Sequence, residues 1–424
     1  MRTGVSVRRM TLAALVAVTV SAAAGAADRR DHKAIPSRSI RQASGYDANA
    51  RAGQFDKVCS AIQKQFYDKN FNGVDWMRIC DLYRSKLSGV RSKAEFKALV
   101  NAMLGELHVS HTSYVDDTDI DYSMLGAVME QDLQGHKVAH IGIMGHPVGA
   151  EFIVTGIFDG GPAEKAGLLT GDRILSVDGK PFETAGSFKG KEGQTVSVQF
   201  RREGNPAPQT ADVTPVKQNV VKAFLDATLQ SARILTVGKQ KIGYVHLWTM
   251  GNDAFKTTLE QLVLGKLHNT DGLILDLRDG YGGNPFGYAD VFFRPDVAWE
   301  QRYHGSPAST KYTGYGKPMV ALIDGGSRSA KEFFTYQLKK TRRAVLVGTT
   351  TAGAFLGAGK VDIGADGMLE LAIVGLRVDE KVLEGVGVTP DVVVPLAHAY
   401  TDRDTQLLRA EEILSRQVSH EVVR

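Results

Sequence analysis

Residues 272–283 read GLILDLRDGYGG, and this stretch indicates the fold of the chain. Its first part, Gly272–Arg278, is a nearly continuous apolar run, which is typical of a strand buried on both faces of a parallel sheet. Glycines follow the strand at once. A second buried strand, Pro318–Ile323, is followed by residues 325–329, which read GGSRS. Because ligands of such sheets bind beyond the carboxyl ends of the strands, both glycine clusters are candidates for a functional site.

Strand and helix patterns alternate on both sides of this stretch. We expect further strands and helices at Lys241–Leu247, Asn252–Leu267, Pro285–Phe292, Ser329–Lys340 and Ala344–Gly348. The alternation predicts an α/β core over residues 219–400, built in layers. Residues 401–424 are predicted to form a charged C-terminal helix.

Apolar residues recur at helical spacing between residues 48 and 108. They predict a helical N-terminal domain over residues 47–117, preceded by a flexible leader at 27–46. Its first two helices each carry one of the two cysteines of the chain, Cys59 and Cys80. In an antiparallel helical hairpin the two would lie at the same level, where a disulfide can form. Two small core residues on packed helices are the alternative, and the sequence leaves both open.

The first 26 residues have the pattern of a cleaved signal peptide. Arg2, Arg8 and Arg9 form a charged region, Met10–Ala23 is apolar, and residues 24–26 (AGA) offer a cleavage site. The alternative is a membrane anchor, but a span needs about 20 apolar residues. Removing residues 1–26 takes away three arginines and no acid, so the net charge of +4 falls to +1. We therefore expect a periplasmic or secreted protein without stable membrane insertion.

Composition excludes several classes of protein. The chain has 424 residues, of which 43% are hydrophobic and 23% charged, so it is neither disordered nor collagen-like. Its length predicts two to four domains. The small net charge and the absence of a Lys/Arg-rich block argue against a nucleic-acid binder. Neither H-E-x-x-H nor a His/Cys cluster with zinc spacing occurs, so no metal or other cofactor is implied.

Residues 160–180, GGPAEKAGLLTGDRILSVDGK, lie among short runs with strand character in residues 124–215. They resemble the second half of a PDZ domain of the bacterial, protease-associated type. The resemblance implies a PDZ-like β domain over residues 118–218, a module that binds extended peptide tails at a sheet edge. It also implies a carboxylate-holding loop before this run, near Leu125, Gly126, Ala127 and Val128.

Ser329 stands where a buried strand gives way to a helix. Backbone N–H groups at a helix start are free and carry positive partial charge, as a nucleophile and an oxyanion hole require. The alternative is an ordinary N-cap serine. Neither G-x-x-x-x-G-K-[ST] nor a dinucleotide fingerprint accompanies the glycines, which argues against a phosphate loop.

In order along the chain, seven segments resemble the C-terminal processing (tail-specific) peptidases, and more closely their tricorn-protease-like branch. They are FYDKNFNGVDW (66–76), GELHVSHTSY (105–114), the PDZ run, LILDLRDGYGG (273–283), GGSRSAKEFF (325–334), RAVLVGTTTAGA (343–354) and LEGVGVTPDVVV (383–394). The resemblance covers nearly the whole mature chain. It implies a multi-domain α/β protein with a helical domain, a PDZ-like domain and a crotonase-like ββα layered serine peptidase core.

The resemblance also implies site residues. The family nucleophile lies three residues before the acid that opens the helix, here Glu332, which gives Ser329; the neighbouring Ser327 is the alternative. One branch activates its serine with a lysine, but Ala354 occupies that position here. Lys331 should point to another face of its helix, and Lys360 lies outside the motif.

The other branch pairs its serine with a histidine in the S-H-T segment and an acid before G-V-x-P-D, which gives His111 and Glu384. His108 is a competing histidine. A surface or capping histidine and a solvated glutamate in a turn are the plain alternatives. The resemblance places the oxyanion donors at Ala330 and at Gly282 or Gly283, although the preceding turn departs from the family's R-x-N-P-G-G.

These residues predict an exported serine endopeptidase that cleaves unfolded or tail-recognised proteins through an acyl-enzyme. Its partners would be protein or peptide substrates, and a homo-oligomer is an open alternative. Because His111 lies in the helical domain, catalysis would require that domain to close on the core, and peptide binding to the PDZ-like domain could control this closure. The competing class is a non-catalytic binding protein: a peptide-binding PDZ scaffold, or a crotonase-like carrier of apolar ligands.

Overall fold

The computed structural model describes residues 47–130, 137–149, 151–364, 366–395 and 404–421. The predicted signal peptide (1–26) and leader (27–46) lie outside these residues, as do the two ends of the predicted C-terminal helix. No helix in the described ranges is both long enough and apolar enough to cross a membrane.

A six-stranded sheet forms the α/β core, as the buried strands predict. Its strands run in the order β10-β11-β13-β17-β18-β21, and all neighbours are parallel except β10 and β11. Parallel order explains why β13 and β17 are buried at every position and apolar except at Asp276, the last residue of β13, since both faces are covered. The strands are β10 Arg233–Val237, β11 Gln240–His246, β13 Gly272–Asp276, β17 Met319–Ile323, β18 Val345–Gly348 and β21 Val392–Val393.

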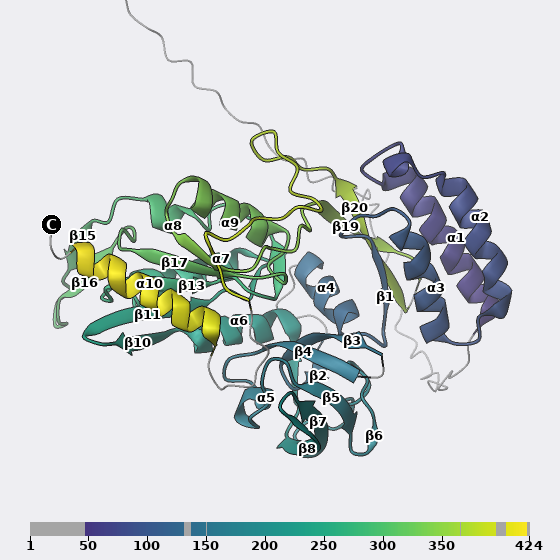
Figure 1. Cartoon of the computed structure of the whole chain (residues 1–424), viewed down its shortest axis with the longest axis horizontal. Coiled ribbons are helices and arrows are strands. Elements are labelled where there is room, and N and C mark those ends of the chain that lie inside the picture. Colours follow the sequence, from purple (N-terminus) through teal and green to yellow (C-terminus); the bar gives the residue numbers. More distant parts are fainter. Residues whose placement is uncertain (1–46, 131–136, 150, 365, 396–403, 422–424) are drawn as a thin grey trace, which may run out of the picture. The chain divides into compact units, whose positions relative to one another are not determined.

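Helices cover both faces of this sheet. Ile274 of β13 joins a cluster with Ala410 and Leu414 of α10 (Thr405–Glu421), which lies across the strands (Figure 1). Its neighbours Leu273 and Leu275 point to the opposite face, into the largest core cluster. That cluster also receives the apolar sides of α6 (Val220–Ser231), α7 (Asp253–Leu264) and α9 (Ala330–Lys340). The carboxyl ends of β13 and β17 therefore lie at the edge of a sheet whose two faces are both covered by helices.

The predicted helical domain contains three helices, α1 (Ala48–Gln65), α2 (Trp76–Lys86) and α3 (Lys93–Gly105). At the start of each helix, one side chain accepts a hydrogen bond from a backbone N–H of the first turn. The accepting side chains are those of Asp47, Asp75 and Ser92 in turn. A disulfide joins Cys59 of α1 to Cys80 of α2, with their Cα atoms 6.2 Å apart. The two short 3₁₀ turns are Phe71–Gly73 and Leu87–Gly89.

The chain leaves this domain earlier than predicted. Within the expected helical range, β1 (Ser113–Asp116) is a strand, and it pairs with β20 (Gly367–Val374) from the other end of the sequence. With β19 (Gly357–Asp362) they form a three-stranded sheet in the order β1-β20-β19. Leu369 and Leu371 of β20 belong to the same apolar cluster as helices α1 to α3. The pairing of β1 with β20 therefore holds the residues just before β1 close to the C-terminal part of the core.

The PDZ-like part is a sheet in the order β3-β4-β5-β7-β8, with β6 paired to β5, and a separate β2-β9 pair. Asp178 and Gly179 form the turn between β5 and β6, and both residues have positive φ (51° and 73°). A single-turn helix, α5 (Pro162–Lys165), begins at Pro162, whose fixed φ suits the first position of a helix. The strands are β2 Lys137–His140, β3 Ile143–Val148, β4 Glu151–Ile157, β5 Arg173–Val177, β6 Lys180–Pro181, β7 Val196–Arg202, β8 Asn205–Val213 and β9 Val216–Asn219.

Two predicted elements are wrong. Residues expected to begin the β-rich part instead form a helix, α4 (Ile120–Glu130), because Met124 is buried in the core cluster that contains α6. The helix predicted at Pro285–Phe292 shortens to one turn, α8 (Asp290–Phe293). Gly287, whose φ of 84° is not helical, lies inside the predicted range and interrupts it.

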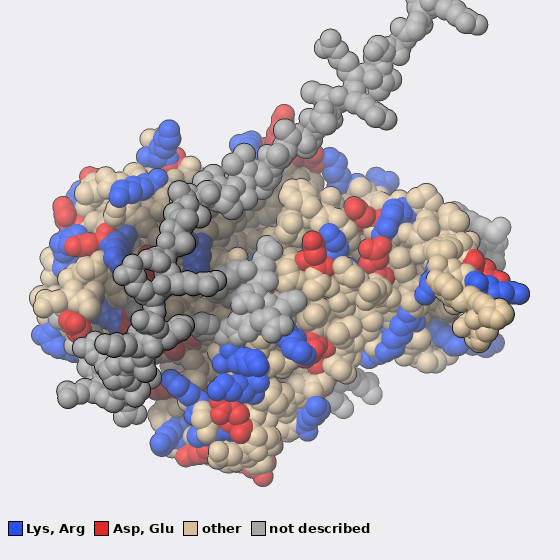
Figure 2. All heavy atoms as spheres, turned by 180° about the vertical axis from the view of Figure 1, so that it is seen from behind, with Lys and Arg blue, Asp and Glu red and all other residues tan. Residues whose placement is uncertain are grey.

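Two short strand pairs complete the core. β12 (Thr249–Met250) pairs in parallel with β14 (Tyr281–Gly283), which contains the glycines that follow β13. β15 (Ala298–Gln301) and β16 (Ser309–Tyr312) form an antiparallel hairpin. On the face drawn in Figure 2, Lys and Arg side chains are interspersed with Asp and Glu, as a small net charge leads one to expect.

Candidate active site

Ser329 lies at the start of α9 in a backbone conformation that few serines adopt. Its φ is 57° and its ψ is −124°. The Ser329 N–H donates to the carbonyl of Ala354 (2.8 Å) and to the Glu332 carboxylate (3.3 Å). Ser329 and Glu332 form a capping box, in which the Ser329 side chain faces the Glu332 N–H at the start of α9. The neighbouring groups therefore hold the unusual conformation of Ser329.

The alternative nucleophile, Ser327, is a buried structural residue. Its Oγ donates to the carbonyl of Leu277 (2.8 Å) and accepts from the N–H of Asp324 (3.1 Å). The side chain is fully buried. A hydroxyl committed in this way connects the turn after β17 to the end of β13, and it is closed to a substrate.

Gly282 packs directly against Ser329. A Cβ on Gly282 would lie 2.4 Å from Ser329 Cβ and 2.8 Å from both Ser329 Oγ and the Ala330 nitrogen. Only glycine fits there. Gly283 faces elsewhere, since its Cβ would meet the Met250 carbonyl of β12 at 2.2 Å. Of the two predicted glycines, Gly282 is therefore the one beside the serine and the first N–H of α9.

Lys331 supports the turn that carries Gly282. Its side chain is completely buried, and Nζ donates to the carbonyls of Asp279 (2.6 Å) and Arg278 (3.4 Å). Burial lowers the pKa of Lys331 to about 7, against the opposing charges of Asp276, Asp279 and Asp324. Burial also raises the pKa of the Asp279 carboxyl, with the Asp324 charge adding to the effect. The amine thus bonds to backbone carbonyls and makes no bond to Ser329.

Glu332 organises the loop that faces the nucleophile. Its buried carboxylate accepts hydrogen bonds from Thr351 Oγ1 (2.5 Å), from the Gly353 N–H (2.8 Å) and from the Ala354 N–H (2.8 Å). Burial raises its pKa, and these bonds oppose that rise. Ala354, the residue at the family's lysine position, contributes only backbone atoms to these contacts.

His111 is linked to Glu384 through the hydroxyl of Ser110. Ser110 Oγ lies 2.7 Å from His111 Nδ1 and donates to Glu384 Oε2 (3.0 Å), while the Ser110 N–H donates to Oε1 (2.7 Å). A carboxylate can only accept, so the single hydroxyl proton of Ser110 points to Glu384. The Nδ1–H of His111 must then donate to Ser110 Oγ. This tautomer leaves Nε2 of a neutral imidazole free to take a proton.

The surroundings of His111 keep its imidazole neutral. Burial lowers the pKa of His111, and the Arg328 charge lowers it further, whereas Glu370 and Glu384 act in the opposite direction. His108, the competing histidine, is exposed and takes no part in this network. A neutral imidazole near pH 7 is the form that a general base requires.

One backbone segment joins the three predicted catalytic residues. The Ala354 carbonyl accepts from Ser329, and the next N–H, that of Phe355, donates to Glu384 Oε2 (2.6 Å). Residues 111, 329 and 384, far apart in the sequence, are therefore connected through a few hydrogen bonds. Within the described ranges no hydrogen bond joins Ser329 Oγ to His111 directly.

Three family models match successive parts of the chain. A Tricorn protease C1 domain matches residues 47–105, a PDZ domain residues 137–214, and Peptidase family S41 residues 241–394. Residues 241–394 contain Ser329, Gly282 and Glu384. This part of the chain matches peptidase family S41. Together with relatives named carboxyl-terminal-processing proteases, the match indicates that the protein is a serine peptidase.

Relatives of this peptidase carry two kinds of name. A chloroplastic C-terminal processing peptidase of Tetradesmus obliquus is 24% identical over 359 residues, which cover 80% of this chain and 76% of the relative. A carboxy-terminal-processing protease of Bartonella bacilliformis is 26% identical over 335 residues, covering 74% and 73%. The tricorn protease of Thermoplasma volcanium is 23% identical over 386 residues, which cover 86% of this chain but only 36% of that protein.

Solved structures share the fold. The crystal structure of the tricorn protease matches with a TM-score of 0.53 at 17% identity, covering 88% of this chain and 37% of the other. Mature CPAF matches with a TM-score of 0.51 at 13% identity, covering 88% and 98%. These likenesses bear out the multi-domain α/β architecture.

The carboxylate-holding loop predicted at Leu125–Val128 is a helix. The four residues lie inside α4, and the matched PDZ domain begins only at residue 137. Leu125 packs against the main core cluster, which makes α4 part of the catalytic core. The prediction treated a glycine between apolar residues as a loop, although the same pattern fits one face of a buried helix.

Ser110 and Lys331 are the contributors that sequence reasoning missed. Ser110 stands directly before His111, and its hydroxyl could have been considered as a bridge to the acid. Nothing in the sequence indicates that the Lys331 amine is buried under the Arg278–Asp279 carbonyls. No group of three or more His, Cys, Asp or Glu side chains in the described part of the chain is arranged to hold a metal.

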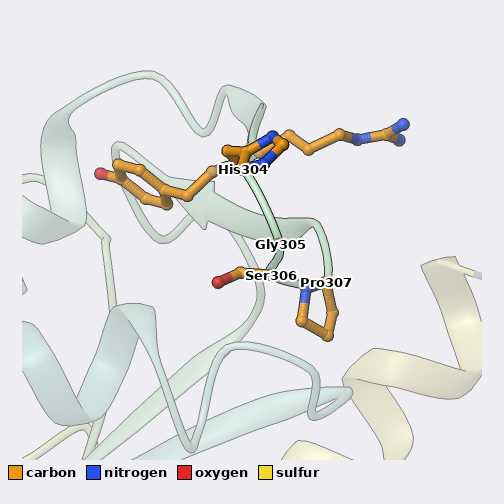
Figure 3. A pocket seen from close by; sticks show the side chains of 6 residues that line it. His304, Gly305, Ser306 and Pro307 are labelled. Carbon is orange, nitrogen blue, oxygen red and sulfur yellow. The ribbon is translucent and has the colours of Figure 1, made fainter.

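A hollow elsewhere on the surface is unrelated to these residues. Figure 3 shows it at the turn between β15 and β16, where successive residues 302–307 line it. None of the predicted catalytic residues contributes to it. A depression formed by one exposed hairpin turn lacks the convergent polar groups of an active site.

Proposed function

We propose that Ser329 is the nucleophile of this peptidase, His111 its general base, and Glu384 the acid that orients His111 through Ser110. The observation that carries the proposal is the continuous hydrogen-bonded path from Ser329 through residues 354–355 to Glu384, Ser110 and His111. The tautomer required by that path leaves the imidazole nitrogen that a base needs.

In this proposal His111 Nε2 takes the Ser329 proton as Oγ attacks a peptide carbonyl. The resulting oxyanion accepts a hydrogen bond from the Ala330 N–H, at the positive end of α9, and Gly282 leaves room for the substrate carbonyl. When the C–N bond breaks, His111 returns the proton to the leaving amine. Water, deprotonated by His111, then hydrolyses the acyl-enzyme. The serine and the imidazole first move into hydrogen-bond distance.

The proposed substrates are unfolded or tail-recognised proteins outside the cytoplasm. The names of the relatives support cleavage near carboxyl termini. Among the described strands β3 pairs only with β4, so its other edge is open to an extended peptide. The Cys59–Cys80 disulfide and the predicted signal peptide support export. N-terminal sequencing of the protein from a periplasmic fraction should find a start near residue 27.

Labelling with a fluorophosphonate and cleavage of an unfolded protein test the catalytic assignment together. Ser329→Ala should abolish both, and His111→Ala should lower kcat by 10²–10⁴-fold. Ser110→Ala should lower kcat less, since Glu384 keeps its bond to the backbone N–H of residue 110. Ala354→Lys should not restore activity to His111→Ala.

His108→Ala is the matched control, since it removes an exposed histidine three residues away. It should leave both measurements unchanged. Full activity of His111→Ala would overturn the assignment of the base. Absence of labelling in the wild-type protein, with ligand binding retained, would instead favour the non-catalytic binding protein.

A further inference from the structure

Arg328 is an exposed cation held between two anchored neighbours and directly precedes the candidate nucleophile. On one side Ser327 is buried, and its carbonyl accepts from the Ala352 N–H (3.0 Å). On the other side Ser329 is fixed by Ala354 and Glu332. The backbone of Arg328 therefore has little freedom, while its side chain is exposed.

The guanidinium lies over a rigid aromatic platform. Arg328 Cζ is 5.6 Å from the centre of the Tyr281 ring. That ring is buried: its hydroxyl donates to Asp121 Oδ1 (2.7 Å) and Phe224 packs edge-on against it at 5.7 Å. Tyr281 directly precedes Gly282, which contacts Ser329. Stacking on a fixed ring holds the guanidinium in place beside the nucleophile.

No carboxylate of the described residues forms an ion pair with Arg328. The two acids whose charges act on His111 are already engaged: Glu384 binds Ser110 and the Phe355 N–H, and Glu370 accepts from Ser113 Oγ (3.0 Å). An arginine presents five donors in a planar fork that fits a carboxylate with two parallel bonds. The donors of Arg328 are therefore available to a group supplied by the substrate.

We propose that Arg328 is a specificity-determining residue whose guanidinium binds a carboxylate of the peptide substrate close to the scissile bond. This rests on the proposed function of Ser329 as the nucleophile. The carboxylate comes either from an Asp or Glu side chain or from the free carboxyl terminus of the chain being cut. Both present the same two oxygens to the guanidinium, and the peptides described next separate them.

The test begins with reduced and alkylated α-lactalbumin, whose cleavage sites under wild-type enzyme are mapped by mass spectrometry. Synthetic peptides spanning one cleaved bond then carry Glu or Gln at each of the three positions on either side. A second set ends within three residues of the bond, as free acid or as amide. The measured quantity is kcat/KM for the wild type, Arg328→Gln, Arg328→Lys, Arg328→Glu and Ser329→Ala.

The wild type should cleave the carboxylate peptide at least tenfold faster than its neutral partner at one position. Arg328→Gln should lose that preference while changing the neutral peptide less than about threefold, and Arg328→Lys should keep part of it. Arg328→Glu should favour a Lys-containing peptide instead. A preference confined to Glu peptides assigns a side chain, and one confined to free acids assigns the terminus.

Arg342→Gln is the matched control, because Arg342 is an exposed arginine beyond the other end of α9. It should retain the wild-type preference. If Arg328→Gln lowers kcat/KM equally on all peptides, or keeps the wild-type preference for the carboxylate peptide, the proposal for Arg328 is overturned. Cleavage of the neutral peptide by Arg328→Gln but not by Ser329→Ala would leave the proposed function intact in either case. Cleavage by Ser329→Ala would overturn the proposed function itself.

Discussion

Ser329 and His111 both have positive φ, at 57° and 52°. Such conformations cost a non-glycine residue on the order of 1–3 kcal/mol, so they persist only where neighbours hold them. For Ser329 the neighbours are the Ala354 carbonyl and the Glu332 carboxylate. The strain projects Oγ from the start of α9, beside Gly282 and the first N–H of the helix.

The pH dependence of kcat/KM should report the environment of His111. Its pKa is lowered by burial and by Arg328, so activity should fall only below the ordinary histidine value of 6.5, as the imidazole gains a proton and can no longer act as base. Arg328→Gln removes one cause of the lowering and should move this acid limb to higher pH. Stopped assays on a neutral peptide between pH 4 and 9 measure it. A limb unaffected by His111→Ala would contradict the interpretation.

Lys331 should matter for both stability and rate. Lys331→Met keeps the volume but leaves the Asp279 carbonyl without its buried donor, which should cost about 1–3 kcal/mol in the free energy of unfolding. A looser turn also misplaces Gly282, so kcat should fall with little change in KM. Lys340→Met, on an exposed lysine of the same helix, is the control. Wild-type kcat and stability in Lys331→Met would show that the turn needs no such support.

At the scale of elements, a strand or helix was predicted correctly where its pattern depends only on residues that are close in the sequence. Strands such as β13 and β17 follow from nearly continuous apolar runs, since burial on both faces favours apolar residues at most positions. The helix expected at Pro285–Phe292 failed because Gly287 adopts a conformation with positive φ. Helix α4 was mistaken for a loop because its apolar residues pack against a core built from distant elements.

The disulfide between α1 and α2 should stabilise the helical domain. The two cysteines are 21 residues apart in the sequence. In the loop-entropy account, the double variant Cys59→Ala/Cys80→Ala should therefore lose about 3 kcal/mol in the free energy of unfolding. Urea unfolding followed by tryptophan fluorescence suits the measurement, since Trp76 donates its Nε1–H to the Cys59 carbonyl. Adding a reductant should bring the wild type to the midpoint of the variant and leave the variant unchanged. Equal midpoints without reductant would count against the bond.

At the scale of the whole molecule, the candidate site depends on the joining of sequence-distant parts. Ser110 and His111 lie just before β1, which pairs with β20, and Glu384 follows β20 in the chain. The turn before β20 is held to α1 and α3 by Asp366, which receives bonds from Arg51 and Gln54 (2.9 Å) of α1 and from Lys93 (2.8 Å) of α3. These contacts connect the first and third helices to the sheet that positions the histidine.

Asp366→Asn should therefore weaken the fold in a pH-dependent way. The cationic partners hold the pKa of Asp366 well below its usual range, although burial opposes them. A depressed carboxyl pKa adds stability above the unfolded value near pH 4 and loses it as the pH falls further. The free energy of unfolding of the variant should be lower than that of the wild type by on the order of 2 kcal/mol at pH 7. The difference between the two should be smaller near pH 3. Asp117→Asn, which removes only an exposed pair with Lys93, is the control, and a deficit independent of pH would refute the ionic account.

Local patterns in the sequence were sufficient for the helical domain, for the α/β core and for a candidate nucleophile at a turn from strand to helix. A buried strand, a glycine turn and a helix start depend on neighbours only a few residues away, and these neighbours can be read in order. The family resemblance added His111 and Glu384 as expectations, which no local rule supplies.

Only the tertiary structure revealed how these groups are connected. The hydroxyl of Ser110 lies between imidazole and carboxylate, Gly282 contacts Ser329, and the Lys331 amine is buried under the turn. The platform under Arg328 is likewise a tertiary feature. Each depends on which of many distant residues come within about 3 Å, and on the direction of each hydrogen bond. Spacing along the chain does not encode either quantity, because the packing of the separate parts sets both.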